Sequence, residues 1–165
     1  MSKKKLFFDF EDGRGEVEAH QHVNPDKSLG GWVENNCEVS DNSFISSNSR
    51  VYNNSSVDNS RVDNSSVYNS RVDNSRVYNL KIKHTKQVFS QSPIGSRNDR
   101  ATAIWDLENK SIVFIAGCFN GNEKEFQKAV LDKHGHSSYG KEYLTFIQNA
   151  KSHFEIWMSE LESLK

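Results

Sequence analysis

One stretch of this chain, SSVDNSRVDNSSVYNSRVDNSRVYNL at residues 55 to 80, consists of near-copies of a single short unit. Its composition is that of a disordered tract, because Ser, Asn, Asp and Arg bury little apolar surface. The spacing of its aliphatic residues argues against disorder, since one recurs at every sixth and then every fifth position. The series is Val33, Val39, Ile45, Val51, Val57, Val62, Val67, Val72, Val77 and Ile82.

Each repeat also carries polar residues at fixed positions. A small residue, usually Ser, precedes the aliphatic residue by two positions, which is the period of a strand with both side chains facing inward. An Asn, Asp or Ser follows by two positions, from Asn35 to Asn79. Asn and Asp tolerate left-handed backbone angles, so they predict a sharp corner after each strand. We therefore expect stacked coils that together bury a core which no single unit can bury alone.

The hexad of Ile or Val, Asn and Ser resembles the hexapeptide-repeat proteins, which fold as left-handed parallel β-helices and include many trimeric acyltransferases. The wider layout, with GGWVENNCEV, tandem Val-Tyr-Asn and Val-Asp-Asn units, SPIGSRNDRATAIW and AGCFNGNEKEF, is similar to small phage and prophage proteins with such repeats. The resemblance implies a short parallel β-helix with three-sided coils. The five-residue steps depart from the family pattern toward pentapeptide-repeat proteins, so the cross-section and the handedness stay open.

The composition divides the chain into three segments. Residues 1–31 predict two short strands around a Gly-containing turn, which we expect to plug the open end of the solenoid. Residues 32–90 carry the repeats, and residues 91–165 have the composition of a small α+β domain. In that domain ATAIWDLENKSIVFIAGCF predicts a hairpin. Asn122 is expected to cap a helix that ends at Gly135, and a long helix is expected from about Lys141.

Charge and cysteine content argue against several classes of function. The formal net charge is −1 and is balanced along the chain, which disfavours nucleic-acid binding. Cys37 and Cys118 lack the CxxC spacing of zinc sites. No apolar stretch approaches ~18 residues and no signal peptide is recognisable. We expect a soluble cytoplasmic protein with no membrane partner, located in the host cytoplasm if it is phage-encoded.

The histidines and Cys118 are the candidates for chemistry. An acyltransferase needs a histidine base, but none lies within the repeats, and His84 at their end either closes the core or faces water. His20 and His22 alternate onto one strand face and form only a weak metal candidate without a third ligand. Cys118 is either a nucleophile near a helix start or, as we favour, a buried residue that continues the alternation of Ile112, Phe114 and Ala116.

The outward positions of the repeat predict ordered rows of side chains. Tyr and Arg are enriched in binding hot spots, although stacked rows also stabilise a sheet by ~0.2–1 kcal/mol per pair. With three strands per coil, Tyr52 should lie beside Tyr68 and Asp58 beside Asp73. The binding-surface candidates are Tyr52, Tyr68, Tyr78, Arg50, Arg61, Arg71, Arg76, Asp58 and Asp73.

A heptad stripe runs along the last predicted helix. Such a stripe is usually intramolecular core, and the predicted hairpin could receive it. A short solenoid buries little surface, however, and self-association would add to its stability. The resemblance favours a trimer. The assembly candidates are Tyr143, Ile147, Phe154, Trp157 and Leu161, in a stripe that also includes Ala150 and Leu164.

These patterns together predict a non-enzymatic binding or scaffold protein without a cofactor, which self-associates and presents a rigid surface to a partner. The phage likeness implies that the partner is a host protein or a small signalling molecule, including a component of antiviral defence. The alternative is an acyltransferase that acts on a sugar or an amine with an acyl-CoA. An ice- or glycan-binding array is disfavoured, because the outward rows are charged.

Overall fold

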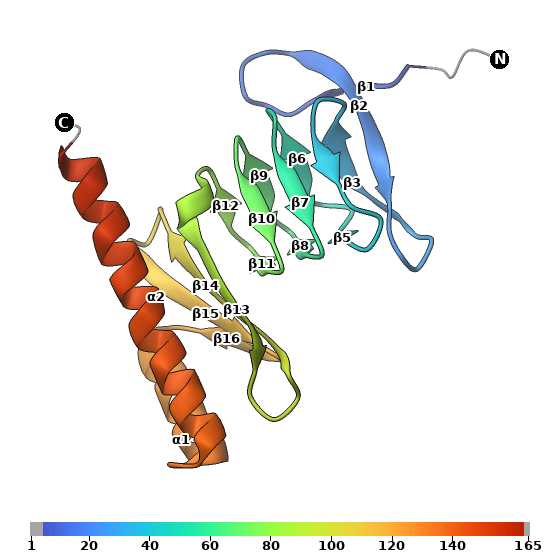
Figure 1. Ribbon diagram of the computed structural model, residues 1–165. Helices are drawn as coiled ribbons and strands as arrows, with labels where there is room; N and C mark the ends of the chain where they lie inside the picture. The colour runs from blue at the N-terminus through green and yellow to red at the C-terminus, as the bar shows by residue number, and fades with distance from the viewer. Residues whose placement is uncertain (1–4, 164–165) are drawn as a thin grey trace. The chain divides into compact units, whose positions relative to one another are not determined.

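The computed structural model describes residues 5–163 (Figure 1). The chain divides into two compact units, Met1–Thr85 and Lys86–Lys165. The first unit is a β-solenoid of about three turns with parallel strands, and the second combines an antiparallel sheet with two helices. No helix in the described part of the chain has the length and apolar character needed to cross a membrane.

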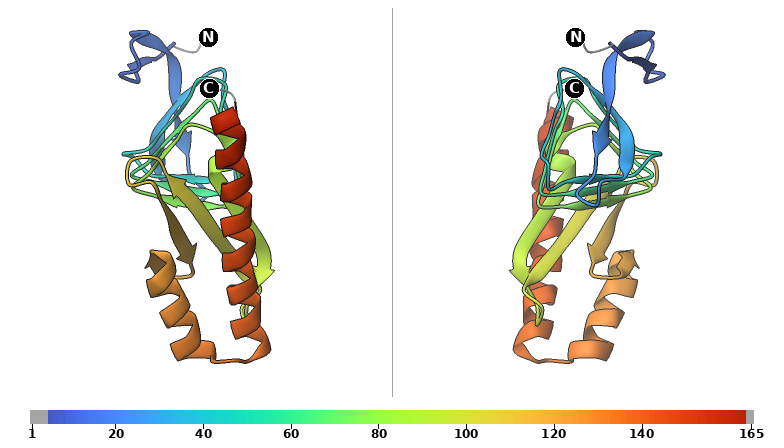
Figure 2. Two further views of the ribbon diagram at one scale, coloured as in Figure 1. Left: turned by 90° about the vertical axis from the view of Figure 1, so that its left-hand side faces the viewer. Right: turned by 90° about the vertical axis from the view of Figure 1, so that its right-hand side faces the viewer.

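The strands of the solenoid are short, and each from β3 to β9 pairs in parallel with the strand that comes three strands later in the chain. They are β3 (Leu29–Glu34), β4 (Glu38–Val39), β5 (Phe44–Ile45), β6 (Arg50–Tyr52), β7 (Ser56–Asp58), β8 (Arg61–Asp63), β9 (Ser66–Tyr68), β10 (Arg71–Asp73), β11 (Arg76–Tyr78) and β12 (Lys81–Ile82). The pairing gives the parallel sets β3-β6-β9-β12, β4-β7-β10 and β5-β8-β11. In Figure 2 the successive turns lie behind one another.

The core of the solenoid is the aliphatic series of the repeat. Every member from Val33 to Ile82 is at most 1 % exposed, except Val39, which is half-buried. The small companions are buried too, and their hydroxyls join the backbone: Ser55 Oγ donates to Tyr52 O at 2.7 Å and accepts from Ser70 N at 3.3 Å. These bonds satisfy polar groups that would otherwise be costly to bury. The predicted inward pair of each unit is confirmed.

The corners of the solenoid are asparagines with left-handed backbone angles. Asn59, Asn64, Asn69, Asn74 and Asn79 have φ between 44° and 55°. Their side chains also form rows along the solenoid, since Asn59 Nδ2 donates to Asn74 Oδ1 at 2.6 Å and Asn64 Nδ2 donates to Asn79 Oδ1 at 2.7 Å. The prediction of an Asn corner after each strand is confirmed for these turns.

The N-terminal segment extends the first sheet and closes the first turn. Strand β1 (Phe7–Asp9) pairs antiparallel with β2 (Glu16–Val23), and β2 pairs antiparallel with β3. Asn24 Oδ1 accepts a hydrogen bond from Ile45 N at 2.8 Å, and the His22 ring bonds Ser43 O at 2.9 Å. These side chains supply two of the hydrogen bonds that a preceding turn would make to the edge of β5.

The second unit is a four-stranded antiparallel sheet followed by two helices. Its strands are β13 (Val88–Ile94), β14 (Asp99–Asp106), β15 (Ser111–Ala116) and β16 (Phe119–Gly121), after a 3-10 turn η1 (Thr85–Gln87). The predicted hairpin is β14 with β15. Helix α1 (Glu123–His134) has a capping box between Asn122 and Glu125 and is followed by Gly135, as predicted, whereas α2 (Ser138–Ser163) begins three residues before the expected Lys141.

Aromatic rings fill the core of the second unit. Phe114 stacks on Phe126 with ring centroids 5.3 Å apart, and Phe146 meets Phe114 edge-on at 6.0 Å. The heptad stripe of α2 packs into this same core. Ile147, Ala150, Phe154 and Trp157 are each at most 3 % exposed, while Tyr143 and Leu161 are half-buried against the same cluster. Leu164 lies outside the described residues.

Candidate functional site

The predicted binding-surface residues of the solenoid are divided among its three parallel sets of strands. Tyr52 pairs with Tyr68, and Asp58 pairs with Asp73, as the repeat predicts. The set β3-β6-β9-β12 carries Arg50, Tyr52 and Tyr68; β4-β7-β10 carries Asp58, Arg71 and Asp73; β5-β8-β11 carries Arg61, Arg76 and Tyr78. The three sets therefore have different chemistry, although they come from one repeat.

The first set is largely occupied by the chain itself. Phe8 stacks on Trp32 with ring centroids 4.6 Å apart, and Phe10 stacks on Tyr52 at 4.9 Å. Arg50 forms an ion pair with Glu11 at 3.0 Å and also lies over the Phe8 ring. Two predicted binding residues, Arg50 and Tyr52, thus contact the N-terminal segment. We call this segment, residues 7–14, the clasp.

An ion pair between the exposed Arg14 and the buried Glu34 fixes the end of the clasp. Both terminal nitrogens of Arg14 donate to the Glu34 carboxylate, at 2.8 and 2.9 Å, and Asn53 N donates to the same carboxylate at 2.7 Å. The hydrogen bonds from Arg14 lower the pKa of Glu34 against the opposing effect of its burial. The repeat places Glu34 on an outward row, but nothing in the sequence pairs it with Arg14, so sequence reasoning missed this contact.

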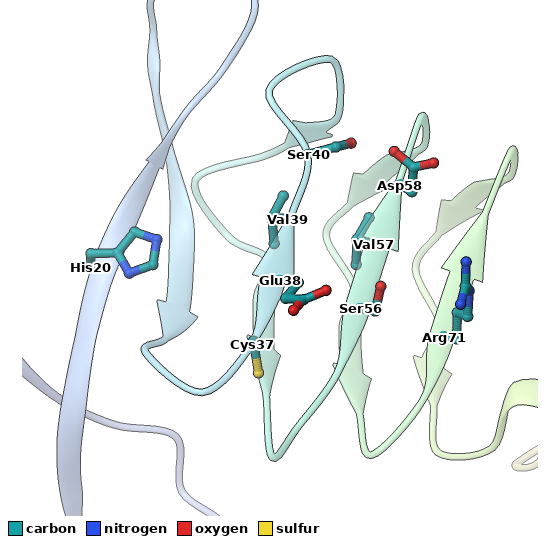
Figure 3. A pocket seen from close by; sticks show the side chains of 9 residues that line it. All are labelled: His20, Cys37, Glu38, Val39, Ser40, Ser56, Val57, Asp58 and Arg71. Carbon is teal, nitrogen blue, oxygen red and sulfur yellow. The ribbon is translucent and has the colours of Figure 1, made fainter.

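The second set of strands carries an open groove of about 510 Å³ (Figure 3). Glu38, Ser56 and Arg71 stand side by side on β4, β7 and β10, and Asp58 lies further along β7. Arg71 is held by Asp73. The groove is lined by His20, Cys37, Glu38, Val39, Ser40, Ser56, Val57, Asp58 and Arg71. Within residues 5–163, neither Glu38 nor Asp58 forms an ion pair.

His20 contributes an imidazole to the groove from β2. Its Nδ1 lies 3.0 Å from Asn35 Oδ1, and the Asn35 amide nitrogen donates to Glu18 at 3.5 Å. Because the amide oxygen therefore faces the ring, Nδ1 is the donor of this hydrogen bond, and in a neutral ring Nε2 is a hydrogen-bond acceptor. Figure 3 shows the ring directed from β2 toward β4. His20 adds an acceptor to a groove that already holds two carboxylates.

The two histidines of β2 do not share a site. His20 is exposed and bonds Asn35, whereas His22 is buried and its ring bonds the backbone at Ser43. No set of three or more His, Cys, Asp or Glu side chains among the described residues is placed to hold a metal ion. His84 is exposed after the last strand of the solenoid and does not line the groove.

Cys37 lines the groove but is not an activated nucleophile. Burial raises the pKa of its thiol to about 11, against the lowering effect of the hydrogen bond that Ser55 N donates to Sγ at 3.3 Å. The thiol is therefore protonated at neutral pH, and the thiolate is the form that attacks. The groove offers hydrogen bonds and charge rather than covalent chemistry.

The preference for a buried Cys118 was wrong. Strand β15 ends at Ala116, and Gly117, with φ of 59°, forms with Cys118 the turn that leads to β16. The alternation of β15 therefore stops before the cysteine, whose side chain is exposed. Gly117 itself was the signal in the sequence, because a Gly between two strands is typical of a tight hairpin turn.

The third set of strands carries arginines in register. Arg61 pairs with Phe44 on one side and with Arg76 on the other, and the Arg61 guanidinium lies 3.9 Å from the centroid of the Phe44 ring. Asp63 is 3.4 Å from Arg61 and pairs with Tyr78. This set therefore presents two arginines and one carboxylate. The groove set presents three carboxylates, Glu38 included, and one arginine.

The predicted assembly residues offer no comparable surface. Ile147, Phe154 and Trp157 are buried inside the second unit, so a second chain could reach them only if that core opened. Comparison of the chain with family models, with curated proteins and with solved structures returned no match. The groove and the arginines of the third set are therefore the candidate site, and their exposed side chains offer charged and hydrogen-bonding groups.

Proposed function

We propose that this chain is a non-enzymatic binding protein that holds a partner at the groove of β4, β7 and β10. One observation supports this most directly. Glu38 and Asp58 are exposed carboxylates that line the groove, and neither forms an ion pair within residues 5–163. Backbone pairing fixes β7, which carries Asp58, to neighbours on both sides, and fixes β4, which carries Glu38, to β7. A surface that is already ordered loses little entropy when it binds.

The partner of such a groove carries hydrogen-bond donors or positive charge. The carboxylates of Glu38 and Asp58 accept hydrogen bonds, as does Nε2 of His20. Arg71 is the one cation in the lining, and Asp73 already pairs with it. Complementary charge determines specificity and the association rate more than it determines affinity.

The resemblance to hexapeptide-repeat and phage proteins supports a more specific form of the proposal. In that form the solenoid is a left-handed parallel β-helix with three-sided coils, and the chain is phage-encoded and acts in the host cytoplasm. Its partner is then a host protein or small signalling molecule, such as a component of antiviral defence. The same resemblance supports self-association as a trimer.

The position of His20 in the groove favours a second candidate function, acyl transfer. Its accepting nitrogen faces a groove, as a general base in a hexapeptide-repeat acyltransferase would. Its orienting partner, however, is the neutral amide of Asn35 rather than a carboxylate that would stabilise an imidazolium. Turnover of acetyl-CoA by the parent and its loss in His20→Gln would establish acyl transfer. Absence of both turnover and cofactor binding would remove it.

Capture of partners from a bacterial lysate by the tagged parent protein and by Glu38→Lys/Asp58→Lys tests the binding proposal. Any partner is identified by mass spectrometry, purified, and titrated calorimetrically against both proteins. The control is Lys124→Glu/Lys141→Glu, which reverses two exposed charges near the starts of α1 and α2, where Glu is compatible with the helix dipole. We expect the groove variant alone to lose the partner. A groove variant that binds the purified partner as tightly as the parent would refute the proposal.

A further inference from the structure

The groove lies along the free edge of a sheet. Strand β4 is the first strand of the set β4-β7-β10, and it pairs with β7 alone. On the β7 side, Glu38 N donates to Ser55 O and Ser40 N donates to Val57 O, each at 3.0 Å. Backbone groups of successive residues in a strand point to opposite edges, so the amide and the carbonyl of Val39 point away from β7. Neither group has a hydrogen-bond partner within residues 5–163, and the outer edge of β4 is therefore open.

The corresponding edge of the neighbouring set is covered by the chain itself. On β5, in the same turn as β4, Ile45 N donates to Asn24 Oδ1 at 2.8 Å, and the His22 ring donates to Ser43 O at 2.9 Å. The segment before the solenoid thus supplies one acceptor and one donor, as a strand of an earlier turn would. Among the residues that the structure describes, no side chain does the same for β4.

The side chain of Val39 is also incompletely covered at this edge. The other members of the aliphatic series are each at most 1 % exposed, whereas Val39 is half-buried. It lines the groove together with Cys37 and with His20, whose ring faces β4 from β2 (Figure 3). The groove therefore combines a partly exposed aliphatic side chain with unused backbone groups. A further strand in the sheet would cover both.

We propose that the groove binds an extended segment of a partner polypeptide, which adds to β4 as a parallel strand. The inference rests on the proposed function, because it names the class of partner that the same groove takes. Repeating the pairing of β4 with β7 one strand further out defines the hydrogen bonds. The partner residue beside Glu38 donates to Cys37 O and accepts from Val39 N, and the residue two positions later donates to Val39 O. These main-chain bonds supply affinity that does not depend on the partner's sequence.

The side chains of β4 select the sequence of that segment. Neighbours in the sheet lie in register, so one partner residue stands beside Glu38 and the next stands beside Val39. Glu38 is exposed and forms no ion pair within residues 5–163, so an opposite charge beside it, Lys or Arg, is favoured. An aliphatic residue is favoured next, because it would cover Val39 as Val57 does from the other side. The expected sequence is a basic residue followed by Val, Ile or Leu.

The repeat of this chain supplies a probe with that sequence. Residues 69–75, NSRVDNS, include β10 at the other end of the same sheet. As a free peptide with blocked ends, NSRVDNS would place its Arg beside Glu38 and its Val beside Val39. One control peptide exchanges the order of Arg and Val, which moves each side chain to the opposite face. Two others carry an N-methyl group on Arg, whose N–H would point at β4, or on Val, whose N–H would point away from it.

The experiment is a titration of the isotope-labelled full chain with each peptide at millimolar concentration, followed by NMR and by amide hydrogen exchange. In the free protein the Val39 amide should exchange rapidly, whereas the amides of Glu38 and Ser40, which donate to β7, should be protected. We expect NSRVDNS and its N-methyl-Val form to protect the Val39 amide. The N-methyl-Arg peptide and the peptide with exchanged side chains should bind about tenfold more weakly.

A Val39 amide that NSRVDNS leaves unprotected would overturn the inference. Equal binding of the N-methyl-Arg peptide would also overturn it, because charge alone would then explain the contact. Protection of Val39 in the free chain that appears only at high protein concentration would identify a second copy as the occupant and exclude a separate partner. If the peptide does not bind while Glu38→Lys/Asp58→Lys still loses its lysate partner, only this inference fails and the proposed function stands.

Discussion

The two units of the chain build their cores in opposite ways. The solenoid repeats one Val or Ile per strand and adds a buried Ser, so its core is made of small side chains at identical positions. The second unit gathers large rings, such as Phe114, Phe126 and Phe146, from three different elements. A repeated backbone lets many small contacts add up along an axis, whereas a unit without repetition depends on a few large side chains.

The largest expected effect is a charge placed in the repeated core. Val62 is 0 % exposed, so Val62→Asp would bury an unpaired carboxylate with no room for water. We expect the solenoid to lose its cooperative melt and residues 33–82 to become sensitive to limited proteolysis. Asp63→Asn, one position along and facing outward, is the control and should melt like the parent. A Val62→Asp protein that melts near the parent temperature would show that the assigned core is wrong.

The second prediction compares the two cores by side-chain truncation. Phe146 is 0 % exposed and contacts the rings of Phe89, Phe114 and Phe126, so Phe146→Ala should lower the free energy of unfolding of its unit by about 3–5 kcal/mol. Val67→Ala removes two methyl groups from one strand of the solenoid and should cost about 2 kcal/mol. Urea titrations followed by circular dichroism measure both values. Equal costs would mean that the repeated core depends on single residues as strongly as the aromatic core does.

A smaller effect is expected at the corners, which only the solenoid has. Asn64 has φ of 46°, a region that costs an ordinary residue about 1–2 kcal/mol. Asn64→Ala should therefore destabilise the solenoid by about that amount. Asn64→Gly removes the side-chain bond to Asn79 but permits the same φ, and it should recover most of the loss. If Ala and Gly have the same effect, the side-chain row rather than the backbone angle stabilises the corner.

The smallest effect concerns reactivity rather than stability, and it compares one cysteine from each unit. Cys118 is exposed in a turn, whereas Cys37 is buried with a thiol pKa of about 11. Since the thiolate is the reactive form, Cys37 should stay unmodified at pH 8 and gain reactivity only as the pH rises toward 11. Iodoacetamide labelling followed by peptide mass spectrometry measures both rates. Equal rates at pH 8 would contradict the burial of Cys37.

The repeat could be predicted from the sequence because its signals recur in nearly every unit. The register of Val and Ile, the inward Ser and the Asn corners are local patterns that agree with one another. In the second unit, Asn122 and Gly135 were recognised because helix caps are local as well. The position of Tyr52 beside Tyr68 could be predicted by counting the residues in each turn.

The candidate site could not be predicted in the same way, because it depends on contacts between distant residues. The clasp places Phe10 on Tyr52, and no spacing in the sequence links these two rings. The groove exists because β2 brings His20 toward β4 (Figure 3). The apolar stripe of α2 was compatible with either an intramolecular core or an interface with a second chain. The structure shows the first, because Phe154 and Trp157 pack inside the second unit.

The length of one turn changes along the solenoid. Val33 pairs with Val51 eighteen positions later, whereas Val57 pairs with Val72 after fifteen. From Val57 onward the turns are interchangeable, since strands and corners recur with the same residue types. Gain or loss of one fifteen-residue block would therefore leave the clasp and the second unit unchanged and still join strands in register. Replication slippage over the repeated codons could thus lengthen or shorten the charged rows in steps of one turn, so related genes should differ in turn number more often than in the sequence of a turn.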